Sequence, residues 1–178
     1  IDINYFVGGQ KVMGYKKMKL ANAWMDPTFM KQVISAKIYQ EYLPTGESNL
    51  VKLFSQGNYV GMSVNDESIN KQFLDKHFDE KNGPLFKCDN IDRFCDTTGA
   101  PSAMPPNLNF LGDDSTLYYN SYDMKSDHGW TELVDLIRTI VYEFQNIDSV
   151  LNVDRTLWAF AANQTLQNLD CYNTYYVH

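Results

Sequence analysis

Residues 14–39, GYKKMKLANAWMDPTFMKQVISAKIY, decide the fold of this chain, because they predict a strand that leads directly into a helix. In an extended segment, successive side chains point to opposite faces. Lys17 and Lys19 therefore share one face, while Met18 and Leu20 share the other. This alternation predicts a β-strand with one basic face and one apolar face.

The helix is predicted over residues 25–43. Asp26 is a favourable N-cap, and Pro27 suits the first helical position. Apolar residues then recur four apart beside Val33, at Met30, Ile34, Ile38 and Tyr42. The segment Pro-Thr-Gly-Glu at 44–47 is expected to end the helix.

A β-hairpin and a second helix are predicted to follow. Residues 49–68 alternate as two strands joined at Gln56-Gly57-Asn58, with Gly61 relieving the second strand. Residues 68–78 predict a short helix whose apolar stripe is Ile69, Phe73, Leu74 and Phe78.

The rest of the chain is predicted to be irregular at first and then helical. We expect a turn and strand over 82–89, an irregular segment over 89–116, a strand over 116–125, and helices over 129–146 and 147–169. The last helix is apolar on most sides, so we expect it to be a buried central helix. The order predicts an α+β fold, with a small β-rich lobe over residues 1–125 and the start of a helical lobe over 126–178.

The composition argues against several classes of protein. The chain has 178 residues, of which 44% are hydrophobic, so it can bury a core. Its net charge of −7 argues against nucleic acid or an anionic membrane as the main partner, because both require a basic face. No apolar run approaches the roughly 20 residues of a membrane span. The first residues, IDINYFVGGQ, show neither an initiating Met nor a secretory signal pattern, so we expect a mature or trimmed fragment.

The three cysteines are Cys88, Cys95 and Cys171. Cys88 and Cys95 are close enough in sequence to close a short loop as a disulfide, and two free thiols are an equal alternative, because the compartment decides between them. No Cys-x-x-Cys motif or Cys/His cluster indicates zinc.

Three kinds of residue are candidates for chemistry. Lys17 and Lys19 would bind phosphate groups if their strand lined a binding site, although lysines on a strand usually point into solvent. Glu67 ends the second hairpin strand. It is either an ordinary polar residue at the strand end or part of the N-terminal cap region of the next helix. Asp170 follows a helix too apolar for the surface, so its carboxylate should lie at a helix end near the core, although chain position alone favours a capping or turn Asp. The sequence has no phosphate-binding glycine loop, GxSxG or HExxH motif.

Four of these stretches, taken in order, resemble the spore coat protein H (CotH) kinase family. Residues 14–39 resemble its Lys-bearing strand and Asp-Pro-Thr helix. Residues 51–78, VKLFSQGNYVGMSVNDESINKQFLDKHF, resemble its strand–Gly–strand–Glu segment and following Lys-x-Phe-Leu helix. NGPLFKCD at 82–89 is similar to its Gly-x-Leu-Tyr-Lys strand, and VDRTLWAFAANQTLQNLDCY at 153–172 resembles the helix that leads to its Asn-x-Asp-x-Tyr catalytic motif.

The resemblance implies an atypical protein kinase fold of two lobes that bind ATP with Mg²⁺ or Mn²⁺ between them. The first lobe would bind the nucleotide, and the second would begin the helical lobe and hold the catalytic loop. Members of the family are secreted or cell-surface proteins associated with phosphorylating Ser or Thr of extracytoplasmic partners. The resemblance therefore implies a secreted protein kinase.

Residue roles follow from the same resemblance. Asp170 matches the catalytic Asp, which would orient the substrate hydroxyl and accept its proton. Lys19, or Lys17 on the same face, matches the nucleotide-binding Lys, and we favour Lys19. Glu67 matches the Glu of the nucleotide cleft, and Asn173 corresponds to the metal-binding Asn. The family's second metal-binding Asp follows a later Tyr-Tyr strand, so we expect this chain to lack a complete metal site.

Two other functions stay open. The first is a surface adhesion or ligand-binding module that keeps the kinase-like fold without its activity. The second is a structural module attached to a carbohydrate-degrading complex. Titration with ATP and a divalent metal separates the adhesion module from a kinase, because a ligand that binds the folded protein raises its melting midpoint.

Overall fold

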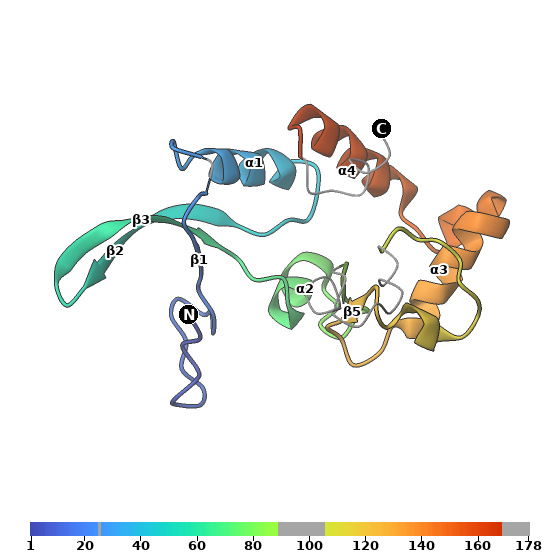
Figure 1. Ribbon diagram of the computed structural model, residues 1–178, viewed down its shortest axis with the longest axis horizontal. Coiled ribbons are helices and arrows are strands. Elements are labelled where there is room, and N and C mark those ends of the chain that lie inside the picture. Colours follow the sequence, from blue (N-terminus) through green and yellow to red (C-terminus); the bar gives the residue numbers. More distant parts are fainter. Residues whose placement is uncertain (25, 89–105, 169–178) are drawn as a thin grey trace, which may run out of the picture. The chain divides into compact units, whose positions relative to one another are not determined.

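The computed structural model describes residues 1–24, 26–88 and 106–168, and the chain is a mixed α+β protein (Figure 1). It divides into two compact units, Ile1–Asp79 and Glu80–His178, which are described separately. The lobe boundary expected near residue 125 stays a prediction. The elements are β1 (Lys19–Ala21), α1 (Lys31–Gln40), β2 (Ser48–Ser55), β3 (Asn58–Asp66), α2 (Lys71–Phe78), β4 (Phe86–Lys87), the 3₁₀ helix η1 (Ser115–Tyr118), β5 (Asp123–Met124), α3 (Trp130–Tyr142), the 3₁₀ helix η2 (Phe144–Ser149) and α4 (Val153–Thr165).

A three-stranded antiparallel sheet organises the first unit, in the order β1-β3-β2 (Figure 1). The predicted hairpin is confirmed, since β2 and β3 are joined at Gln56 and Gly57, whose φ angles of 50° and 82° suit a tight hairpin turn. The register shifts next to Gly61: Leu53 pairs with Gly61 but Phe54 pairs with Tyr59. The extra residue forms a bulge, which strengthens the local twist of the strand.

The lysine-bearing strand is confirmed but short. Lys19 pairs with Asp66 of β3, and Lys17 lies just outside the strand in an isolated bridge with Asp2. Both lysines are exposed, whereas Met18 and Leu20 are half-buried. The predicted alternation of faces is therefore present.

The first helix starts later than the sequence predicts. α1 begins at Lys31, and its N-cap is Met30 instead of Asp26. Asp26 instead closes a turn, because its carboxylate accepts hydrogen bonds from the Thr28 amide, the Thr28 hydroxyl and the Lys31 amide. Pro27 lies in this turn, so its predicted place at the first helical position is wrong.

The predicted apolar stripe of this helix does not form a core. Of the ten described residues of α1, Val33 is buried. Met30, Ile34, Ile38 and Tyr42 are all exposed by more than a third of their surface.

The second helix is confirmed, with Asn70 as its cap. The Asn70 side chain accepts hydrogen bonds from the amides of Gln72 and Phe73, so α2 starts at Lys71. Phe73 and Leu74 are buried and fix the rotation of α2 about its axis.

The strand predicted over residues 116–125 is largely wrong. Residues 115–118 form η1, and β5 covers Asp123–Met124, where it pairs with β4. Tyr118 and Tyr122 are both buried, and the Tyr118 hydroxyl donates to the Gly112 carbonyl at 2.9 Å and accepts from the Leu111 amide. Asn120 is exposed and Ser121 is buried, so burial over 118–122 does not alternate as it would in a strand with one buried face.

The core of the second unit forms around α3, which the sequence correctly predicts. Its buried members are Tyr118, Tyr122, Leu133, Val134 and Ile137, and half-buried apolar residues such as Phe86 and Trp130 pack against them. α3 ends at Tyr142 and gives way to η2, so the predicted helix over 129–146 is shorter than expected.

The last helix is not the buried central helix that the sequence predicts. Of its described residues, α4 buries Ala162, while Leu157 is 59% exposed and Trp158 is 43% exposed. Its apolar residues lie on most sides of the helix, so no single face could bury them all. No helix within the described ranges is long and apolar enough to cross a membrane.

Candidate functional site

The two predicted phosphate-binding lysines differ in their surroundings. Lys17 Nζ lies 3.9 Å from the Asp2 carboxylate, and both side chains are well exposed. Lys19 is exposed on β1, opposite Asp66 of the central strand. An exposed ion pair contributes little to stability, so Lys17 is held only loosely.

Glu67, the predicted cleft residue, lies directly after β3 and is firmly held. Its amide donates to the Glu47 carbonyl at 2.8 Å, and its carboxylate accepts from the Glu47 amide at 3.1 Å. The Glu67 side chain is 4% exposed. A carboxylate this deeply buried requires a compensating positive charge or several hydrogen bonds.

Lys76 of α2 supplies that positive charge. Its amine lies 2.6 Å from Glu47 Oε1 and 3.4 Å from Glu67 Oε1, and it donates to the Tyr15 hydroxyl at 3.4 Å. Partial burial opposes the charged amine, but its hydrogen bonds to Glu47 and Tyr15 and the two carboxylate charges raise the pKa of Lys76 overall. Lys76 is therefore a permanent cation.

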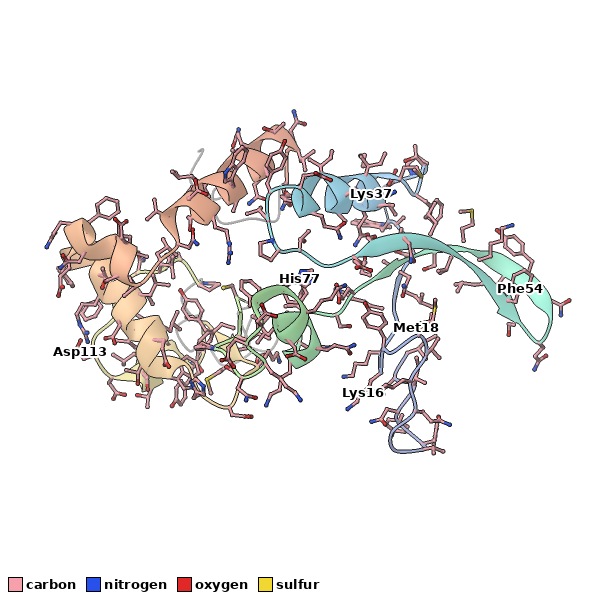
Figure 2. The ribbon with its side chains drawn as sticks, turned by 180° about the vertical axis from the view of Figure 1, so that it is seen from behind. Lys16, Met18, Lys37, Phe54, His77 and Asp113 are labelled. Atoms are coloured by element: carbon pink, nitrogen blue, oxygen red, sulfur yellow. The ribbon has the colours of Figure 1, made fainter. Side chains whose placement is uncertain are left out.

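His77 completes this group of side chains, which we name the Glu67 cluster: Tyr15, Glu47, Glu67, Lys76 and His77. His77 Nε2 lies 3.5 Å from Glu67 Oε2, and its ring packs 4.4 Å from the ring of the buried Phe73. Figure 2 shows His77 on α2, far from Phe54 at the tip of the hairpin. The cluster therefore lies at the base of the hairpin.

The structure thus gives Glu67 a partner that the sequence did not predict. Within the described residues, neither Lys17 nor Lys19 forms an ion pair with Glu67, and Lys76 takes that place. The available signal was the strong amphipathic pattern of residues 71–78, which predicts Phe73 and Leu74 on the buried face. This pattern does not predict whether Lys76 or His77 forms the ion pair with Glu67.

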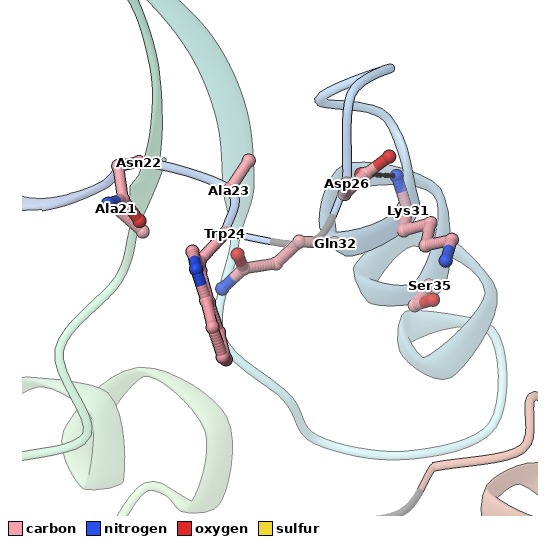
Figure 3. A pocket seen from close by; sticks show the side chains of 8 residues that line it. All are labelled: Ala21, Asn22, Ala23, Trp24, Asp26, Lys31, Gln32 and Ser35. Carbon is pink, nitrogen blue, oxygen red and sulfur yellow. Dashed lines mark hydrogen bonds between the residues drawn. The ribbon is translucent and has the colours of Figure 1, made fainter.

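A pocket of about 390 Å³ lies on the same unit, between the end of β1 and the start of α1 (Figure 3). Its polar lining includes Asn22, Lys31 and Gln32, and Trp24, which is 82% exposed, lies beside Gln32. Gln32 donates to the Asp66 carboxylate at 2.6 Å, which connects the pocket wall to the strand that pairs with Lys19.

Asp26 also lines the pocket but is already engaged. It is 8% exposed, and hydrogen bonds from the Thr28 hydroxyl and from the Lys31 and Thr28 amides lower the pKa of its carboxyl despite its burial. Two of these bonds stay within the turn before α1, and the third comes from Lys31, the first residue of α1. Asp26 is therefore a structural carboxylate, not a proton acceptor for chemistry.

The predicted catalytic Asp170 and metal-binding Asn173 lie outside the described residues, as do Cys95 and Cys171. Their roles stay predictions. Within the described ranges, no group of three or more His, Cys, Asp or Glu side chains is arranged to hold a metal ion.

Comparison with known proteins gives one family. A family model with the description CotH kinase protein matches residues 3–178, which is nearly the whole chain. No curated protein matches the sequence.

Proposed function

The chain belongs to the CotH kinase protein family, and from this premise we propose that it is an atypical kinase that transfers phosphate from ATP to Ser or Thr of an extracytoplasmic protein. The family match over residues 3–178 is the observation that carries this proposal. The lysine-bearing strand and the buried Glu67 support it, because the resemblance of residues 14–39 and 51–78 to the family assigns nucleotide binding to these residues.

In this proposal the fold is kinase-like, with a small β-rich nucleotide lobe and a helical lobe. Lys19 neutralises phosphate charge from the exposed face of β1, and Lys17 is the second candidate on that face. Glu67 lies at the end of the next strand of the sheet, one residue beyond the partner of Lys19. Phosphoryl transfer depends mainly on positioning and charge, and such residues supply both.

The proposed chemistry requires one proton acceptor. The hydroxyl oxygen of the substrate forms a bond to the γ-phosphorus, the bond from that phosphorus to the β–γ bridging oxygen breaks, and ADP leaves. Asp170 is the proposed acceptor of the hydroxyl proton. It would also orient that oxygen for in-line attack.

Family membership implies a divalent metal, Mg²⁺ or Mn²⁺, beside ATP. Asn173 is the proposed protein ligand. The described side chains form no metal-ligating group of three, so they do not by themselves fit the ion, and we derive no step through it.

Localisation and partners belong to the same proposal. We expect a secreted or cell-surface protein whose partner is an extracytoplasmic protein, including one at the cell surface or associated with carbohydrate. The net charge of −7 opposes nucleic acid as a partner.

Thermal unfolding with ATP and Mg²⁺ or Mn²⁺ tests the proposal. ATP at a hundred times its Kd should stabilise the protein by about 2.7 kcal/mol and raise the melting midpoint. Labelled phosphate from ATP should then appear on a peptide that contains Ser and Thr. If the midpoint does not move at millimolar ATP, the proposal fails and the adhesion or ligand-binding module is favoured.

A further inference from the structure

We propose that Lys76 is a positioning residue for Glu67, so that nucleotide binding depends on a lysine that itself does not contact the nucleotide. This inference rests on the proposed kinase function. Its basis is the arrangement of charged side chains at the base of the hairpin.

Glu67 is buried at the base of the hairpin. With a side chain 4% exposed, its carboxylate cannot be solvated by water, so the groups around it decide where it lies. The Glu47 amide provides one hydrogen bond, and the other neighbours are Lys76 and His77. Of these two, Lys76 carries the permanent charge.

The Lys76 amine reaches three other side chains of the Glu67 cluster. An ammonium group has three donors, and this one is within reach of Glu47, Glu67 and Tyr15. These residues come from the segments before β2, after β3 and before β1, so one side chain connects three parts of the first unit. Loss of the amine would leave the Glu67 carboxylate with the Glu47 amide and His77 as its partners.

The helix that carries Lys76 is itself fixed in place. Lys76 lies in the last turn of α2, whose start is capped by Asn70 and whose face is fixed by the buried Phe73 and Leu74. The Lys76 side chain therefore extends from a fixed position on a helix and not from a mobile loop. The carboxylates outnumber the amine two to one within the Glu67 cluster, so Lys76 is also its main source of positive charge.

The test compares Lys76→Met with Lys37→Met. Lys37 is a matched control, because it is an exposed lysine in the last turn of α1, as Lys76 is in the last turn of α2. We expect Lys76→Met to weaken ATP binding, measured as Kd by calorimetry, on the order of tenfold, since small displacements of positioning groups have effects of this size or larger. Lys37→Met should leave the Kd unchanged.

Two further variants separate positioning from general destabilisation. Lys76→Arg keeps the charge and should restore ATP binding to within a few-fold of wild type. Glu67→Gln should weaken binding as Lys76→Met does, and the double variant should be no worse than either, because both changes remove one interaction. If Lys76→Met fails to fold, Lys76→Gln replaces it, with the same expected direction.

A second readout does not depend on nucleotide. The Glu47 amide donates to Glu67, so its hydrogen exchange should become faster in Lys76→Met if Glu67 moves. If wild type does not bind ATP, the proposed function fails. If wild type binds ATP and Lys76→Met binds it equally well, or if the losses in the double variant simply add, the positioning role is wrong.

Discussion

Lys17 and Lys19 are both exposed, but Lys17 lies just before β1 and Lys19 lies within it, and their different neighbours distinguish their roles. Lys17 already faces Asp2, whereas Lys19 lies within the sheet beside β3, which ends at Asp66, one residue before Glu67. We expect Lys19→Ala to weaken ATP binding by about tenfold or more, the scale of a hydrogen bond to a charged group. Lys17→Ala should change the Kd by less than about threefold, since it removes an exposed ion pair.

Calorimetric titration with ATP measures both variants. Lys52→Ala, which removes an exposed lysine from β2, is the control for loss of positive charge. A larger effect at Lys17 than at Lys19 would assign the nucleotide-binding role to Lys17 instead.

The hydrogen bonds of Asp26 predict that the stability of the folded protein depends on pH. The Thr28 hydroxyl, and then the Lys31 and Thr28 amides, lower the pKa of its carboxyl in the folded protein. A carboxyl with a lowered folded pKa contributes stability above its unfolded pKa of about 3.9, and this is lost as the pH falls through the folded value. Asp26→Ala should therefore lower the melting midpoint by several degrees at pH 7 and by less at pH 3.

Melting curves of wild type and Asp26→Ala at the two pH values check this. Asp75→Ala serves as the control, because Asp75 is an exposed acid on α2. A difference between wild type and Asp26→Ala that stays constant with pH would show that the turn does not depend on the ionised carboxylate.

The sequence predicts single residues well where their partners are close along the chain. Glu67 could be placed at a strand end, since the hairpin pattern fixes that position. Its partner Lys76 could not be predicted, because the pairing depends on the rotation of α2, which the buried Phe73 and Leu74 set through tertiary packing.

At the scale of elements, Gly129 limits how α3 can begin. Gly129 is the N-cap of α3 with a φ of 144°, and a Cβ there would lie 2.9 Å from Phe86 Cε2 and 3.0 Å from Pro84 Cβ. Gly129→Ala should destabilise the protein by about 2 kcal/mol, from backbone strain and overpacking together. Denaturation with urea measures the loss.

Gly8→Ala is the matched control for this substitution. A Cβ at Gly8 meets no atom within 4 Å, so that variant should have nearly wild-type stability. Equal stability of the two variants would mean that Phe86 and Pro84 move aside at little cost.

The hairpin, α2 and α3 were predicted from the sequence pattern, whereas the start of α1 and the strand over 116–125 were not. The hairpin follows from the turn at Gln56-Gly57 and was correct. The predicted start of α1 was wrong because Asp26 forms a turn with Thr28 first. Its carboxylate then accepts a hydrogen bond from the amide of Lys31, where the helix begins. The strand over 116–125 was wrong because the Tyr118 hydroxyl binds backbone seven and six residues earlier, at Leu111 and Gly112.

At the scale of the whole molecule, the proposed roles divide between two parts of the sequence. Lys19 and Glu67 belong to the first unit, Ile1–Asp79, whereas Asp170 comes near the end of the chain. Sequence patterns found these residues separately, but hydrophobic periodicity and spacing carry no information on distances between segments so far apart. The family match relates them to one function without giving that geometry.

This division predicts that binding and chemistry can be separated by substitution. Asp170 is proposed to act on the substrate hydroxyl and not on the nucleotide. Asp170→Ala should therefore reduce phosphoryl transfer by on the order of 10²-fold or more, the scale of general-base catalysis. It should leave the ATP-induced rise in melting midpoint unchanged.

A transfer assay and a thermal titration on the same preparation measure the two effects. Asp148→Ala is the control, because Asp148 is an exposed carboxylate in the same half of the chain. Full transfer activity in Asp170→Ala would remove Asp170 from the mechanism. Loss of the ATP-induced shift together with transfer would place Asp170 at the nucleotide instead of at the hydroxyl, since only a residue that holds ATP changes its affinity directly.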